Sequence, residues 1–145
     1  MQLIILTVLA TIFYSMFVIF AGLAGGKINS WLAVVMYNAI ATVIPLGIYL
    51  FSSGKESKTT LKGVIFAGIA GIGVLVFSLL LARIFNRGGN LGFVIPTIYG
   101  SAIVLTTGFG WLFLKEKVTG LQTAGLVLVV VGVAVIIFAK LRVNV

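Results

Sequence analysis

The side chains best suited to chemistry in this 145-residue chain are hydroxyl, amide and aromatic groups that lie inside long apolar stretches. Lipid offers such groups no hydrogen-bonding partner, so they indicate either a functional site or a packed helix interface. Tyrosine rings can stack on an organic molecule, and hydroxyl and amide groups can hydrogen-bond to it. We therefore expect a binding site for a polar organic solute, with helix packing as the alternative for each residue alone. Its predicted lining is Tyr14, Tyr37, Asn38, Pro96, Tyr99, Ser101 and Thr106.

The two prolines of the chain both lie within apolar stretches. Pro96 has no amide hydrogen, so the carbonyl of Gly92 loses its helical donor and becomes available to water or to a ligand. Pro45 frees the carbonyl of Ala41 in the same way. Transporters often build binding sites from such interrupted helices at membrane depth. The alternative is a simple kink, in which a neighbouring Ser or Thr satisfies the freed carbonyl.

Residue types that support hydrolytic, redox or metal chemistry are scarce. The sequence has no cysteine, histidine or aspartate, so we expect no catalytic residues, no metal site, no cofactor and no enzymatic activity. The two acidic residues, Glu56 and Glu116, lie between apolar stretches. This position argues against antiporters that exchange a proton for a cation at a membrane-embedded glutamate.

The elements that must position these groups are predicted by charge-free stretches. These cover residues 1–26, 28–54, 63–82, 88–114 and 118–139, and each can cross about 30 Å of hydrocarbon as a helix. With 61% hydrophobic and 8% charged residues, the chain has little material for a domain outside the membrane. The sequence thus predicts an all-α integral membrane protein with a single five-span domain over residues 1–145, its spans at about 3–23, 31–51, 61–82, 91–114 and 119–139.

The basic residues are divided equally between the two predicted membrane faces. If the spans alternate, one face holds Lys55, Lys58, Lys62, Lys115 and Lys117, and the other holds Lys27, Arg83, Arg87, Lys140 and Arg142. An excess of Lys and Arg normally selects the cytoplasmic face, so a tie predicts insertion in both orientations or orientation by a partner chain. These residues suit contact with anionic lipid head groups, and we expect no nucleic-acid binding. Arg83 has a second interpretation, as a ligand for an anionic solute.

Small residues recur at helical spacing in two of the predicted spans. Helix association in lipid depends on close backbone approach at such positions. The third span carries Gly63, Ala67 and Gly71, and the fifth carries Gly125 and Gly132. These faces either pack within the chain or meet a second copy across a two-fold axis.

The last third of the chain resembles the end of an EamA-type domain of the drug/metabolite transporter superfamily. The segment Gly110 to Val135 reads GWLFLKEKVTGLQTAGLVLVVVGVAV. In that family a span ends at a glutamate, here Glu116, followed by Val118-Thr119, Gln122, Gly125 and Gly132-Val133, and a proline matching Pro96 lies early in the preceding span. The sequence departs from the common pattern at Lys115, where glycine usually precedes the glutamate.

This resemblance implies a secondary transporter or exporter of small organic metabolites or drug-like solutes. The commoner family members have ten spans in two halves of opposite orientation, so the chain corresponds to one half of an inverted-repeat transporter. An antiparallel homodimer, or pairing with a homologous five-span chain, would rebuild the whole. The expected location is the lipid bilayer of a prokaryotic inner membrane. The expected mechanism is alternating access, in which the binding site for a small-molecule solute opens to one side of the membrane at a time.

Two other functions stay open at this point. One is a heteromeric subunit of a transporter or of a lipid-linked-sugar flippase, whose second chain fixes the orientation. The other is a non-transporting membrane scaffold subunit that packs through its glycine faces. The scaffold predicts that changes at the mid-span tyrosines leave function intact, whereas bulky residues at Gly71 or Gly125 destroy it.

Overall fold

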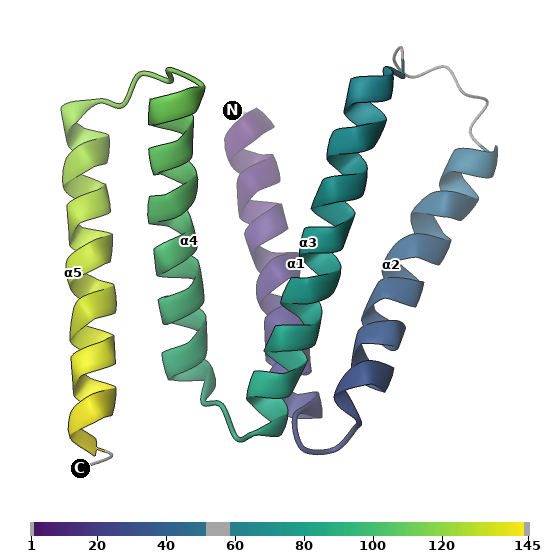
Figure 1. The fold of residues 1–145 in the computed structure, drawn as a ribbon, viewed down its shortest axis with the longest axis horizontal. Helices are drawn as coiled ribbons and strands as arrows, with labels where there is room; N and C mark the ends of the chain where they lie inside the picture. The colour runs from purple at the N-terminus through teal and green to yellow at the C-terminus, as the bar shows by residue number, and fades with distance from the viewer. Residues whose placement is uncertain (1, 52–58, 144–145) are drawn as a thin grey trace. The chain divides into compact units, whose positions relative to one another are not determined.

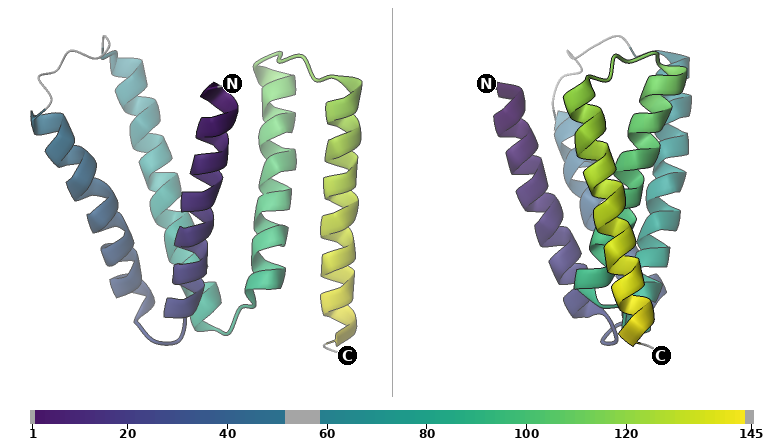
Figure 2. Two further views of the ribbon diagram at one scale, coloured as in Figure 1. Left: turned by 180° about the vertical axis from the view of Figure 1, so that it is seen from behind. Right: turned by 90° about the vertical axis from the view of Figure 1, so that its left-hand side faces the viewer.

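The fold consists of long apolar helices joined by short connections. The computed structural model describes residues 2–51 and 59–143, with side chains over 3–51 and 59–142. These residues form five α-helices and no strand (Figure 1 and Figure 2). All of them are long and apolar enough to cross a membrane, which confirms the predicted all-helical membrane fold. The helices are α1 (Gln2–Ala24), α2 (Ser30–Phe51), α3 (Leu61–Asn86), α4 (Leu91–Phe113) and α5 (Gly120–Val143).

Two helices run further than the sequence predicted. α3 ends at Asn86 rather than Ala82, and α5 ends at Val143 rather than Ala139. The added turns carry basic side chains, which interact favourably with the negative end of a helix dipole while their charges reach the interface. The predicted polar loop after α2, with Lys55, Glu56 and Lys58, lies outside the described residues.

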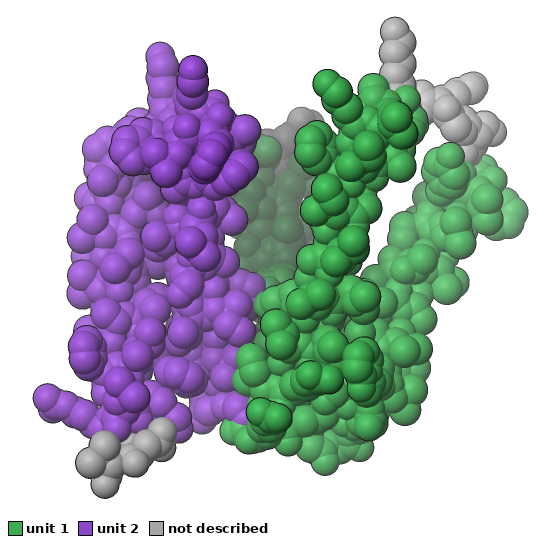
Figure 3. Space-filling view, in the orientation of Figure 1, with its two compact units in different colours: residues 1–88 green, residues 89–145 purple. Residues whose placement is uncertain are grey.

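The chain divides into two compact units, residues 1–88 and residues 89–145 (Figure 3). The first unit holds α1, α2 and α3, and the second holds α4 and α5. The single five-span domain therefore stays a prediction.

The core of the first unit lies at one end of its three helices. They converge at the end that carries the 25–29 connection and separate toward the other end (Figure 1). At the convergent end, Gly25 approaches α3 so closely that an added Cβ would lie 2.8 Å from the Cβ of Phe85. Small residues there let the helix backbones approach each other. The buried residues of this unit are Val18, Ala21, Ala33, Val34, Ser78, Leu81, Ala82 and Phe85.

A single asparagine joins the 25–29 connection to the end of α3. The side-chain Nδ2 of Asn86 donates to the carbonyl of Ile28 at 3.0 Å and to Ser30 Oγ at 2.7 Å. Its Oδ1 accepts from the amide of Gly26 at 2.6 Å. Because one side chain satisfies three groups of the neighbouring turn, it fixes how α1, α2 and α3 meet.

The second unit is the tight antiparallel hairpin of α4 and α5 that the short connection predicts. The two helices come closest at Gly100, where an added Cβ would collide with Cγ2 of Val133. This contact requires glycine, since Val133 is a stiff β-branched residue held by its own helix.

The turn between α4 and α5 folds back on the last turn of α4. The carbonyl of Gly110 accepts from the amides of both Leu114 and Glu116, each at 3.1 Å. Lys115 between them has a φ of 55°, in the left-handed region that glycine adopts most easily. A glycine, which the resemblance predicts at this position, would adopt this conformation without strain, and Lys115 adopts it with a side chain attached.

The first turn of α5 is closed by a reciprocal cap. The amide of Thr119 donates to Gln122 Oε1 at 2.8 Å, and the amide of Gln122 donates to Thr119 Oγ1 at 3.3 Å. This is a capping box with glutamine in the third position. It gives the Thr119 to Gln122 spacing of the family motif a structural role.

Candidate solute-binding site

Two of the predicted site residues in the first unit are linked by a third aromatic ring. The ring centre of Phe17 on α1 lies 6.3 Å from that of Tyr14 and 5.5 Å from that of Tyr37 on α2. The rings of Phe17 and Tyr37 pack edge to face, with an angle of 89° between their planes. Tyr37 also packs against the small buried cluster of Ala33, Val34 and Ala82, whereas Tyr14 is 40% exposed. Tyr37 therefore contributes to helix packing, and Tyr14 presents more of its ring to the surroundings.

Four further polar side chains of the first unit, one on α2 and three on α1, hydrogen-bond within their own helices. Asn38 Nδ2 donates to the carbonyl of Val34 at 2.8 Å. Such bonds occupy a donor and leave the acceptor oxygen of the side chain available, so the residue can lie in an apolar environment and still meet a solute donor. The hydroxyls of α1 that donate in the same way, four residues back, belong to Thr7, Thr11 and Ser15.

The remaining predicted site residues lie in the second unit, all on α4: Pro96, Tyr99, Ser101 and Thr106. α4 is continuous through Pro96, and α2 is continuous through Pro45. Neither proline breaks its helix, and the freeing of the Gly92 and Ala41 carbonyls for a ligand stays a prediction. The hydroxyl next to Pro96, Thr97 Oγ1, donates to the carbonyl of Phe93 at 2.7 Å.

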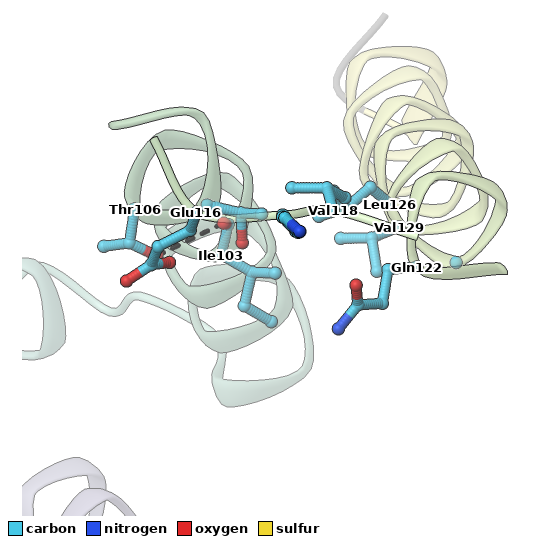
Figure 4. Close-up of a pocket in the computed structure, with 10 residues that line it drawn as sticks. Ile103, Thr106, Glu116, Val118, Gln122, Leu126 and Val129 are labelled. Carbon is cyan, nitrogen blue, oxygen red and sulfur yellow. Dashed lines mark hydrogen bonds between the residues drawn. The ribbon is translucent and has the colours of Figure 1, made fainter. Parts of the chain in front are cut away.

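A pocket of the second unit is lined by residues of α4, of α5 and of the connection between them (Figure 4). Its volume is about 640 Å³, within the range of small-molecule sites. Thr106 and Gln122 line it together with Glu116, and Ile103 and Val129 form apolar walls. A smaller pocket of about 270 Å³ contains Ser101. Thr106 and Ser101 thus line different pockets.

Glu116 lies in the connection, as predicted, but its carboxylate turns back toward α4. An added Cβ at Gly110 would lie 2.5 Å from Glu116 Oε2. Gly110 therefore makes room for the carboxylate, and the left-handed Lys115 turns the chain so that it reaches this place. Neither Glu116 nor Gln122 is among the site residues that the sequence predicts, although the Thr-x-x-Gln spacing indicates a helix start.

The seven predicted residues divide between the units, three in the first and four in the second. In the first unit, Phe17 links Tyr14 on α1 to Tyr37 on α2, and Asn38 is the next residue after Tyr37. The other four predicted residues are spread along α4. Their union in one pocket stays a prediction.

The predicted small-residue faces are open in the described part of the chain. A Cβ added at Gly71, Gly125 or Gly132 would meet no atom within 4 Å, and at Gly63 it would meet only the capping Thr60 Oγ1. Ala67 is exposed as well. Among the described residues, close packing uses other glycines, of which Gly100 shows the tightest approach.

Arg83 lies in the last turn of α3 with its guanidinium carbon 5.5 Å from the centre of the Trp31 ring. This geometry is a cation–π contact between α3 and the start of α2. It fits the interpretation of both side chains as interfacial anchors.

The comparisons with known proteins agree with this architecture. A model of the EamA-like transporter family matches residues 1–138, which include α1 to α4 and most of α5. Comparison of the chain with curated proteins and with solved structures gave no match.

Proposed function

Because the chain belongs to the EamA-like transporter family, we propose that it moves small organic metabolites or drug-like solutes across a prokaryotic inner membrane by alternating access. The family match over residues 1–138 carries this proposal, since members of the family are transporters rather than enzymes. The chain is an integral, multi-pass membrane protein, which suits such work.

The proposed transporter is an antiparallel homodimer with all five helices acting as one membrane domain. Two observations support this assembly. The basic residues are split five to five between the predicted faces, so neither orientation is favoured. The glycine face of α3 also has open space at Gly71, as a helix surface that awaits a partner would have.

The proposed solute site lies near the middle of the membrane between the two copies. Tyr14, Tyr37 and Asn38 line it from α1 and α2, and Pro96, Tyr99, Ser101 and Thr106 line it from α4. The exposed ring face of Tyr14 and the unoccupied acceptor oxygen of Asn38 support a site for a polar organic molecule.

A flux assay tests the site. The protein is reconstituted in vesicles, and the efflux of a panel of organic solutes is followed for wild type, Tyr99→Ala and Tyr49→Ala. Tyr49 is the matched control, because it lies on α2 and is 72% exposed. We expect Tyr99→Ala to abolish flux and Tyr49→Ala to retain it. Equal flux in all three proteins would remove the pocket assignment, and transport of no solute by wild type would favour the scaffold function.

Cysteine labelling tests the assembly, and the cysteine-free sequence makes it direct. A single cysteine at position 144 is labelled in intact cells with an impermeant thiol reagent, and the remainder is labelled after permeabilisation. Two populations of similar size are the expected result for dual insertion. A single population would contradict the homodimer and favour a heteromeric complex with a second chain of opposite orientation.

A further inference from the structure

The pocket between α4 and α5 changes from polar to apolar with depth. Glu116 and Lys117 line its upper end in the connection, and Gln122 follows in the first turn of α5. Val129 lies nine residues inside the start of α5, or about 14 Å at a rise of about 1.5 Å per residue. Ile103 lies at a similar depth on α4. Such a change from polar to apolar lining at one membrane interface fits an amphiphile whose polar end lies at the connection between α4 and α5.

The polar end of the pocket carries one charge of each sign. Glu116 and Lys117 are adjacent in the chain and both line the pocket. Among the described side chains, Glu116 is the only carboxylate. Lys117 would repel a purely cationic ligand, and Glu116 would repel a purely anionic ligand, so neither kind of ligand is favoured. A ligand with both an ammonium and an anionic group satisfies both residues.

The type of ammonium group follows from the pocket wall. Three of its polar members, Thr106, Thr107 and Glu116, offer oxygen acceptors suited to the N–H donors of a primary ammonium. A quaternary ammonium has no N–H and is held by aromatic rings, and the residues lining this pocket include no aromatic side chain. The wall therefore favours a primary over a quaternary ammonium.

We propose that this pocket binds the head group and upper acyl chain of an aminophospholipid such as phosphatidylethanolamine. Its ammonium meets Glu116, its phosphate meets Lys117, and its glycerol and first acyl carbons lie against Ile103 and Val129. The carboxylate lies beside α4, because Gly110 leaves space for it and Lys115 turns the chain toward that helix. This lipid-binding proposal is independent of the proposed transport function, because lipid binding is measured without solute flux.

Native mass spectrometry of the detergent-purified protein tests the proposal. Phosphatidylethanolamine, phosphatidylcholine with the same acyl chains and free phosphoethanolamine are titrated separately. We expect phosphatidylethanolamine to bind at least tenfold more tightly than either of the others. Equal affinity for the two lipids would overturn the head-group assignment. Equal affinity for phosphoethanolamine would overturn the lipid assignment in favour of a soluble zwitterion.

Matched variants locate the site on the protein. Glu116→Gln keeps the shape of the side chain and should lower phosphatidylethanolamine affinity about tenfold, and Lys117→Gln should also lower it. Lys140→Gln is the control, because it removes the same charge as Lys117→Gln but lies in the last turn of α5 and does not line the pocket. A Gly110→Ala variant, checked for folding by circular dichroism, should displace the Glu116 carboxylate and weaken binding as well. Phosphatidylethanolamine affinities of Glu116→Gln and Lys117→Gln equal to that of Lys140→Gln would refute the site.

Discussion

Replacement of Gly100 by alanine tests the packing of α4 against α5 most directly. The added Cβ would collide with Cγ2 of Val133 and would lie 3.6 Å from Cγ1 of Val129. A β-branched residue in a helix strongly prefers one χ1 rotamer, so Val133 cannot turn away without strain. The hairpin must therefore open slightly around the new methyl group, or Val133 must adopt a disfavoured rotamer.

The size of the effect can be estimated against Gly108→Ala on the same helix. An alanine at Gly108 meets no atom within 4 Å, and it should stabilise the helix by about 1 kcal/mol through propensity alone. Gly100→Ala gains the same propensity but carries an overpacking cost of about 1 to 3 kcal/mol. We expect a difference in unfolding free energy of about 2 kcal/mol, which corresponds to about 4 to 8 °C in Tm for a chain of this size.

The assay is thermal unfolding in detergent, followed by circular dichroism at matched protein and detergent concentrations. Val133→Ala and the double variant with Gly100→Ala complete a double-mutant cycle. The double variant should recover most of the loss, because Val133→Ala removes the colliding methyl group. Equal Tm values for Gly100→Ala and Gly108→Ala, or a cycle without coupling between Gly100 and Val133, would refute the described contact.

Three further predictions concern the connections between helices. Asn86→Ala removes three hydrogen bonds and should destabilise the first unit by about 2 kcal/mol. Hydrogen exchange at the Gly26 amide should become faster, and an unchanged exchange rate would contradict the role of Asn86 in holding the 25–29 connection. Lys115→Gly should stabilise the hairpin by about 0.5 to 1 kcal/mol through relief of the left-handed residue, whereas Lys117→Gly should not; the comparison is made by Tm. Gln122→Ala should lower the free energy of unfolding by about 1 kcal/mol by removing the cap, whereas Gln122→Glu should largely preserve it. Equal Tm values for Gln122→Ala and Gln122→Glu would count against the capping box.

The connection between α4 and α5 shows how far motif reading extends. The spacing of Thr119 and Gln122 predicts a helix start, and the structure places α5 there, from Gly120. The departure at Lys115 from the family's glycine had no evident meaning in the sequence. Its φ of 55° supplies one, since glycine adopts such a left-handed backbone more easily than lysine does.

The glycines show where motif reading stops. Regular spacing drew attention to Gly71 and Gly132, yet the close approaches in the described chain occur at Gly25 and Gly100. Spacing indicates that a helix can present a small-residue face, but it does not say which face meets a neighbour. That choice depends on the partner helix, whether it belongs to the same chain or to a second copy.

The sequence by itself determined the number and apolar character of the helices and the positions of the charges near their ends. These properties are local, because in lipid each backbone segment must satisfy its own hydrogen bonds and so must be helical. Tertiary structure alone decided that Asn86 would hold the 25–29 connection and that Glu116 would lie against Gly110. Both depend on how the chain turns between helices, because a polar side chain finds its partner only when that turn brings the two together.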